Sequence, residues 1–131
     1  MSLQSFITLG NLEVYKLSIQ LSKSAWEIFQ NLEWIYKKTI GIQFLEATDS
    51  IGGNIAEGYG RFHYLDKIKF FYNSRGSLLE SRHWFNLLAD RNLVKNAENR
   101  REYLEAYKII RPLLNGLIHS TYKQKKELKP S

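Results

Sequence analysis

Apolar residues recur every three or four positions along nearly the whole chain, which is the period of an α-helix that buries one face. The pattern predicts four helices, at residues 11–36, 40–61, 65–92 and 97–126. Long helices joined by short connections favour an antiparallel up-down-up-down bundle. Because no stretch alternates between apolar and polar residues as a β-strand does, we expect an all-α chain. Residues 1–131 are expected to form one domain, with a flexible basic tail at 127–131.

The first predicted helix carries more apolar surface than one bundle core covers. Its core stripe consists of Val14, Leu17, Leu21, Ala25, Ile28 and Leu32. A second, more aromatic stripe lies about 130° around the helix and consists of Leu12, Tyr15, Ile19, Trp26 and Phe29. A large exposed apolar patch usually marks an interface, so we expect self-association through this second stripe. The alternative is that the other helices wrap more widely around the first.

The stretch SIGGNIAEGYGR, residues 50–61, has the glycines of a phosphate-binding loop without its other residues. A Walker loop requires lysine and then serine or threonine after its last glycine, and Tyr59 and Gly60 stand at those positions. Placed on a helix, the stretch has one apolar face and an opposite face of small and polar residues. A glycine inside a helix costs about 1 kcal/mol relative to alanine, so we expect these glycines to mark close packing.

Two arginines lie within the predicted apolar face of the third helix. That face comprises Ile68, Phe71, Tyr72, Leu78 and Leu79, and the arginines are Arg75 and Arg82. A buried unpaired charge is costly, so each needs a partner. If the second and third helices fold back on each other, Asn54 and Glu57 come level with Arg75. We expect these three residues to form a polar cluster, which is either a structural latch or part of a ligand site.

Composition narrows the classes of function. The chain has no cysteine, which excludes disulfides and thiolate metal sites. No apolar run is long enough to cross a membrane and the N-terminus does not resemble a signal peptide, so we expect a cytoplasmic protein. The three histidines have no ligand spacing with one another or with carboxylates, and no nucleophile motif is present. We therefore expect no enzymatic activity, no metal and no cofactor.

The whole chain has a net charge of +6, and its basic residues are concentrated in the C-terminal half. The fourth predicted helix has a buried stripe of Tyr103, Tyr107, Ile110, Leu114 and Leu117. On a flank beside that stripe, and beyond it, the candidate nucleic-acid-binding residues are Arg101, Lys108, Arg111, His119, Tyr122, Lys123 and Lys126. Lysine and arginine bind phosphates by charge, and the rings of His119 and Tyr122 could stack on unpaired bases.

The alternative interpretation of this flank is a solvated basic face. It is favoured by three acidic residues on the adjacent flank, Glu98, Glu102 and Glu105. Pro112 lies within the same predicted helix and is expected to kink it.

The segments NLEVYKLSIQLS, NIAEGYGR, RGSLLE and LLNGLIHS occur in this order. Residues 11–123, which contain these segments, resemble the four-helix-bundle family encoded by intervening sequences of bacterial 23S ribosomal RNA genes. That family is related to the accessory variability determinant of diversity-generating retroelements. The motif positions that carry over are Asn54, Glu57, Gly58, Arg75, Gly76, Ser77 and Glu80. His63 departs from the pattern, because the family usually has a serine helix cap there.

The resemblance implies a barrel-like homopentamer without enzymatic activity. It also implies that the partner is nucleic acid, or a nucleic-acid enzyme such as a reverse transcriptase. Two functions remain open. The preferred one is an oligomeric RNA- or DNA-binding, retroelement-type accessory protein, and the alternative is an oligomeric protein-interaction scaffold that does not bind nucleic acid.

Overall fold

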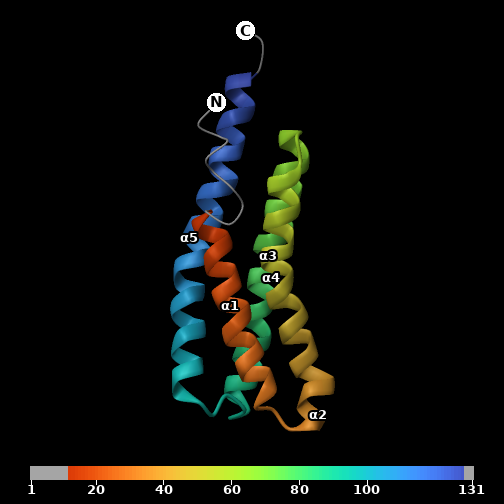
Figure 1. The fold of residues 1–131 in the computed structure, drawn as a ribbon, viewed down its shortest axis with the longest axis vertical. Helices are drawn as coiled ribbons and strands as arrows, with labels where there is room; N and C mark the ends of the chain where they lie inside the picture. The colour runs from red at the N-terminus through yellow and green to blue at the C-terminus, as the bar shows by residue number, and fades with distance from the viewer. Residues whose placement is uncertain (1–11, 129–131) are drawn as a thin grey trace.

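The computed structural model describes residues 12–128, which form helices joined by short connections (Figure 1). The helices are α1 (Glu13–Gln30), α2 (Trp34–Tyr36), the π-helix η3 (Lys37–Gly41), α3 (Ile42–Gly60), α4 (Tyr64–Asp90) and α5 (Ala97–Leu128). No strand occurs over residues 12–128, so the all-α class is confirmed for that part of the chain. Contacts join α1 to α3, α3 to α4, α4 to α5 and α5 to α1. The four long helices therefore surround one core.

The first helix is shorter than the sequence pattern predicts. α1 ends at Gln30, and a turn over 31–33 precedes α2 and η3, so the predicted helix over 11–36 is wrong beyond Gln30. Leu32 lies in the turn but is still buried in the core. The helical spacing of apolar residues thus continues through this turn, so periodicity alone does not show where α1 ends. Asn11, where the predicted helix begins, and the basic tail from 129 onward lie outside the described residues.

The core is built from the inward stripes of all four long helices. Every residue of the predicted core stripe of α1 is buried, as is the predicted stripe of α5 except for the half-buried Leu117. At the centre, the rings of Phe85 and Tyr103 stack with their centroids 4.2 Å apart, and Phe44 lies 5.5 Å from Tyr103. These aromatic side chains bring α3, α4 and α5 together at one level.

A chain of buried hydroxyl groups crosses the core beside these rings. The hydroxyl oxygens of Thr48 and Ser81 lie 2.6 Å apart, and those of Ser81 and Tyr103 lie 2.7 Å apart. Thr48 also donates to the carbonyl oxygen of Phe44 at 2.7 Å. Burial raises the pKa of Tyr103, so its hydroxyl stays protonated. Because a buried hydroxyl without a partner is costly, this network fixes the register of α3, α4 and α5.

Two glycines of α3 allow neighbouring helices to approach closely. A Cβ at Gly52 would lie 2.8 Å from Ser18 Oγ of α1, and a Cβ at Gly58 would lie 2.5 Å from Phe71 Cε1 of α4. Nothing lies within 4 Å of a Cβ built at Gly53 or Gly60. The prediction of close packing is confirmed for Gly52 and Gly58 and is wrong, within one chain, for the other two.

The inward face of α4 differs from the predicted one. Tyr72 is 38% exposed and Leu79 is 54% exposed. Their places toward the core are taken by Ser74 and Ser81, which are fully buried; Ser74 Oγ donates to the carbonyl oxygen of Ile51 at 2.8 Å. A pattern of apolar residues does not reveal small polar residues that point inward. Ile68, Phe71 and Leu78 are buried as predicted, so the true face overlaps the predicted one and is turned toward Ser74 and Ser81.

Two single residues, His63 and Pro112, affect where α4 begins and how α5 runs. His63 caps α4, because its Nδ1 accepts from the backbone N–H of Leu65 at 3.3 Å. α5 continues without interruption through Pro112, whose ring removes one helical hydrogen bond. Figure 1 shows the upper part of α5 leaning relative to its lower part.

Candidate nucleic-acid interface

The side of α4 that faces α5 is basic. Since Ser74 points toward α3, the next residue, Arg75, lies about 100° around the helix and faces α5. Its Nη1 donates to Asn115 Oδ1 of α5 at 3.2 Å. Two turns further along α4, the guanidinium of Arg82 lies 4.9 Å from the ring centroid of Tyr107 in α5. Both arginines thus belong to the boundary between α4 and α5.

The side of α5 that faces α4 carries residues that each come next in sequence after a buried residue. We name the joint surface of the two helices the α4–α5 basic face. It comprises Tyr72, Arg75, Leu79 and Arg82 of α4 and Lys108, Arg111, Asn115, His119 and Tyr122 of α5. At the end nearest the α3–α4 connection, Tyr72 OH donates to Tyr122 OH at 3.3 Å. The sequence pattern predicted only those basic and aromatic residues of this surface that lie on α5.

No described carboxylate lies within 4.0 Å of a cation of the α4–α5 basic face. Over the described part of the chain, ion pairs within 4.0 Å involve only Arg61 with Glu57 and Arg101 with Glu98 and Glu105. The face has no acidic member, and the hydrogen bonds of Arg75 and Arg82 go to the neutral amides of Asn115 and Asn86.

Aromatic rings hold the two arginines in place without cancelling their charge. The guanidinium of Arg75 lies 4.7 Å from the ring centroid of Tyr72, and that of Arg82 lies over Tyr107. A cation over an aromatic face is attracted by the ring quadrupole and keeps its full charge. The half-buried arginines are therefore oriented and remain available to an anion.

The predicted polar cluster of Asn54, Glu57 and Arg75 is not formed. Asn54 Nδ2 donates to the carbonyl oxygen of Ser50, and Glu57 pairs with Arg61 at 3.3 Å. Arg75 turns to Asn115 instead, because the α3-facing position of its helix is occupied by the small residue Ser74. The three side chains thus form neither a latch nor a shared ligand site.

The remaining motif positions lie apart from one another. Gly58 packs against Phe71, Gly76 has open space around it, and Ser77 is half-buried. Glu80 Oε1 accepts from Trp84 Nε1 at 3.3 Å, on the side of α4 away from α5. These residues support the contact of α3 with α4 or face solvent, and they do not gather into a site.

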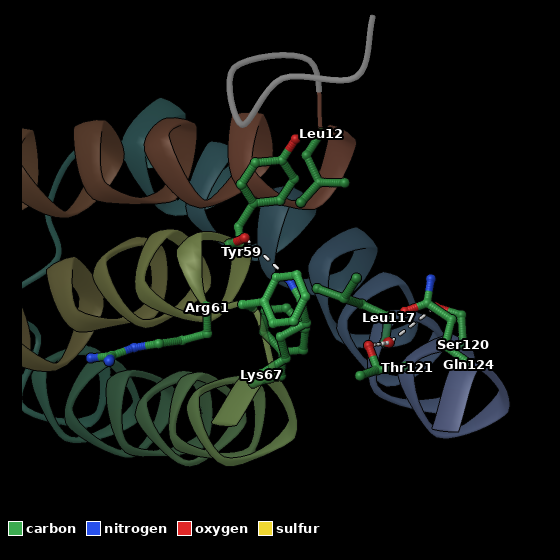
Figure 2. A pocket seen from close by; sticks show the side chains of 10 residues that line it. Leu12, Tyr59, Arg61, Lys67, Leu117, Ser120, Thr121 and Gln124 are labelled. Atoms are coloured by element: carbon green, nitrogen blue, oxygen red, sulfur yellow. Dashed lines mark hydrogen bonds between the residues drawn. The ribbon is translucent and has the colours of Figure 1, made fainter. Parts of the chain in front are cut away.

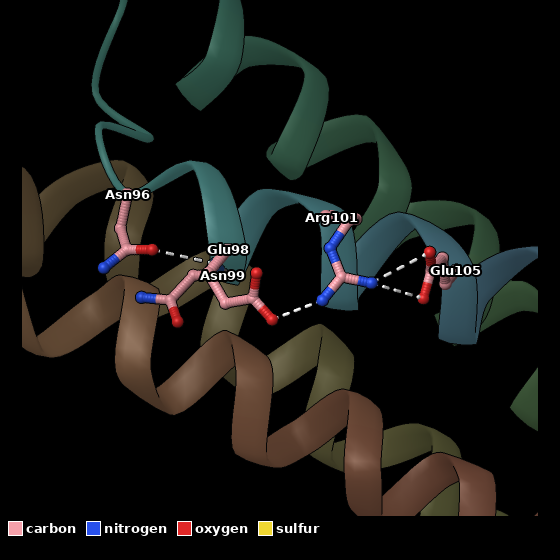
Figure 3. A network of polar contacts seen from close by, with 5 residues as sticks. All are labelled: Asn96, Glu98, Asn99, Arg101 and Glu105. Carbon is pink, nitrogen blue, oxygen red and sulfur yellow. Dashed lines mark hydrogen bonds and ion pairs between the residues drawn. The ribbon is translucent and has the colours of Figure 1, made fainter.

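One candidate residue, Arg101, already forms ion pairs with carboxylates of its own helix. Figure 3 shows its guanidinium between the carboxylates of Glu98 and Glu105 on α5. The hydrogen bond from Arg101 lowers the pKa of Glu98, and the same contact raises the pKa of the arginine. Two carboxylates cancel the attraction of one arginine for phosphate, so Arg101 is a weaker candidate than Lys108 and Arg111.

The other candidates from the end of α5 are exposed. His119, Tyr122 and Lys123 all reach solvent, and Tyr122 makes an edge-on ring contact with Tyr72 at 6.3 Å between centroids. The backbone of Lys126 belongs to α5, and its side chain lies outside the described atoms.

The aromatic stripe of α1 remains partly open to solvent. Ile19 is 50% exposed and Trp26 is 48% exposed, whereas Leu12, Tyr15 and Phe29 are half-buried. The rings of Trp26 and Phe29 stack with centroids 5.7 Å apart. Ile19 reaches toward Gly52 of α3, so the stripe flanks the α1–α3 boundary, which is opposite the α4–α5 boundary in the ring of helices.

A cavity of about 530 Å³ opens beside the α3–α4 connection (Figure 2). Lys67 lines it, and its Nζ donates to the carbonyl oxygens of Tyr59 at 3.1 Å and Gly58 at 3.4 Å. Burial lowers the pKa of this lysine. The ammonium satisfies carbonyls at the C-terminal end of α3, and Figure 2 shows Arg61 extending away from the cavity. No acid–base pair faces this space among the described side chains.

Two further features bear on the class of protein. Over residues 12–128, no three His, Asp or Glu side chains are placed to hold a metal ion. None of the helices in that range combines the length and the apolar character needed to cross a bilayer.

Comparison with known proteins identifies the family. Residues 10–116 match the model for the 23S rRNA-intervening sequence protein. The chain belongs to this family. The resemblance found in its sequence segments is therefore confirmed.

Another member of this fold has been solved for Bacteroides thetaiotaomicron, as a protein with unknown function from the S23 ribosomal protein family. That crystal structure, at 1.70 Å resolution, aligns with this chain with a TM-score of 0.71 and 18% sequence identity. The match covers 86% of this chain and 99% of the other, and at this identity it shows a shared fold. No curated protein matches the sequence significantly.

Proposed function

We propose that this protein is a non-enzymatic, cytoplasmic oligomer that binds the phosphate backbone of RNA or DNA on its α4–α5 basic face. One observation carries the proposal: no carboxylate among the described residues pairs with Arg75, Arg82, Lys108 or Arg111. Uncompensated cations on one face attract a polyanion and gain free energy from the counterions that it releases. The family's connection with ribosomal RNA supports nucleic acid as that polyanion.

The position of the apolar stripe of α1 supports assembly into a homo-oligomer. Ile19 and Trp26 expose apolar surface beside α3, on the opposite side of the ring of helices from Arg82 and Lys108. A subunit contact through this stripe leaves the α4–α5 basic face free. The family resemblance implies a pentamer of antiparallel bundles, and repetition of the basic face around it would convert weak contacts into avidity.

Binding of labelled RNA and DNA strands to charge-neutralised variants tests the proposed interface. Arg82→Gln together with Lys108→Gln removes one uncompensated charge from each helix. We expect the double variant to bind both strands about fivefold to twentyfold more weakly at low salt, since each exposed charge pair contributes up to about 1 kcal/mol. Fluorescence anisotropy measures the affinities.

A matched control comes from α1. Lys16→Gln with Lys23→Gln removes the same total charge from exposed positions outside the α4–α5 basic face. When the variants are compared at about 0.1 M salt, we expect this one to bind as the unmodified protein does, because screening then limits the reach of exposed charges to about 10 Å. Equal losses in both double variants would show that net charge, and not this face, attracts the strand.

A protein-interaction scaffold is the second candidate function, and exposed aromatic surface favours it. Trp34 is 70% exposed and lies on α2, and Ile35 and Trp26 are also exposed. A partner such as a reverse transcriptase could dock on these side chains without contacting nucleic acid. Recovery of a protein partner that depends on Trp34, combined with negligible binding of RNA and DNA at low salt, would favour the scaffold.

A further inference from the structure

We propose that Tyr72 and Tyr122 form a base-stacking platform, which makes the α4–α5 basic face selective for single-stranded over double-stranded nucleic acid. This inference rests on the proposed function, because it names the form of nucleic acid that the same face takes. It comes from the placement of two exposed tyrosine rings, in contact with each other, within a surface that carries several cations.

The two tyrosines come from different helices and meet at one end of the α4–α5 basic face. Their ring centroids are 6.3 Å apart with an interplanar angle of 67°, and Tyr72 OH donates to Tyr122 OH at 3.3 Å. Each residue is 38% exposed. The contact holds the rings in place before any ligand arrives, which reduces the ordering cost of binding.

Cations adjoin this platform directly. The Arg75 guanidinium lies 4.7 Å from the Tyr72 ring centroid and is tied to Asn115. Proteins that bind single strands combine a basic track for the backbone with aromatic rings on which bases stack. The other ring beneath an arginine, Tyr107, is buried and therefore cannot stack on a base.

A duplex gains nothing from exposed tyrosines on this face, because its bases already stack on one another and present only their edges. An unpaired base offers its π-face, and stacking on an aromatic ring is worth a factor of about ten per base in affinity. The basic face is also long and narrow. Lys108 and Tyr122 are fourteen residues apart on α5, or roughly 21 Å, which suits several nucleotides of one strand.

The test uses the full chain and three labelled probes of roughly 16 nucleotides, the upper end of common single-strand site sizes. The probes are a mixed-sequence single strand, the duplex of the same sequence, and a single strand of abasic sugar-phosphate. Tyr72→Leu with Tyr122→Leu removes the rings, whereas Tyr72→Phe with Tyr122→Phe keeps the rings and removes the hydroxyls. Trp34→Leu removes an exposed ring that lies on α2.

We expect the double leucine variant to bind the single strand about tenfold more weakly and to bind the duplex and the abasic strand as before. The double phenylalanine variant should retain most of the single-strand affinity, and Trp34→Leu should retain all of it. The platform is refuted if the double leucine variant binds the single strand normally, or loses duplex affinity to the same extent.

Failure of the platform differs from failure of the proposed function. If Arg82→Gln with Lys108→Gln weakens binding of all three probes while the tyrosine variants have no effect, the basic face stands and the platform is wrong. If the unmodified protein binds none of the probes at low salt, the proposed function itself is wrong, and the inference falls with it.

Discussion

Arg75 of α4 and Asn115 of α5 are joined by a 3.2 Å hydrogen bond from Nη1 to Oδ1, across the boundary between the two helices. The bond orients a guanidinium without neutralising it, because an amide carries no charge. It also makes the basic residues of α4 and α5 parts of one surface. A surface with uncompensated charge on two adjacent helices is better suited to a continuous phosphate backbone than a stripe on one helix.

The pairing of Arg101 predicts a difference between two basic residues on the same helix. Arg101→Gln should change nucleic-acid affinity less than twofold, because Glu98 and Glu105 already balance the arginine. Lys108→Gln should weaken binding about twofold to fivefold, because Lys108 has no acidic partner among the described residues. Anisotropy titrations of the two single variants check this, and a larger loss for Arg101→Gln would contradict the assigned interface.

The glycines of α3 predict opposite effects of one substitution. Gly58→Ala should destabilise the fold by about 1–3 kcal/mol, because the new Cβ would lie 2.5 Å from the buried ring of Phe71. Gly53→Ala should be neutral or stabilise by up to about 1 kcal/mol, because nothing lies within 4 Å of its Cβ. Urea unfolding monitored by circular dichroism measures both. Equal changes would mean that α3 and α4 do not pack as described.

The buried hydroxyl network predicts non-additive stability changes. Ser81→Ala should cost about 1–3 kcal/mol because it leaves the buried Tyr103 hydroxyl without its partner. Tyr103→Phe should cost about 0.5–1.5 kcal/mol, since Ser81 retains Thr48. The double variant should cost less than the sum of the two, because no tyrosine hydroxyl is then orphaned. A strictly additive result in urea unfolding would argue against the network.

The exposed stripe of α1 predicts the outcome of an assembly measurement. Ile19→Asp with Trp26→Glu should convert the oligomer into monomers, because charges would replace about half-exposed apolar side chains at the proposed contact. Lys16→Glu serves as the control, since it adds negative charge to an exposed position of the same helix outside the stripe. Size exclusion coupled to light scattering reports the mass. A monomeric unmodified protein would contradict assembly through this stripe.

Helical periodicity sufficed to predict the fold class and the core stripes of α1 and α5, whereas the family was indicated by four short sequence segments. It failed where a buried residue lies outside a helix or is polar. Leu32 is buried outside any helix, so the apolar spacing runs past the end of α1, while Ser74 and Ser81 are buried inside α4 where the pattern predicted Tyr72 and Leu79.

The two buried serines of α4 also explain the error at the candidate site. A face that includes Tyr72 and Leu79 places Arg75 toward α3, beside Asn54 and Glu57, and leaves the predicted basic surface on α5 alone. Contacts between helices, such as Arg75 with Asn115 and Tyr72 with Tyr122, depend on helix rotation, which a wheel of one helix does not determine.

The salt dependence of binding to a single-stranded oligonucleotide tests the central claim most directly. For the unmodified protein, the logarithm of the binding constant should fall linearly with the logarithm of salt concentration, with a slope near −3 per site if all four uncompensated cations contact phosphates. Replacing Arg75, Arg82, Lys108 and Arg111 together by glutamine should bring the slope close to zero and remove most of the affinity. An unchanged slope in that variant would show that nucleic acid, if bound at all, is not held by the α4–α5 basic face.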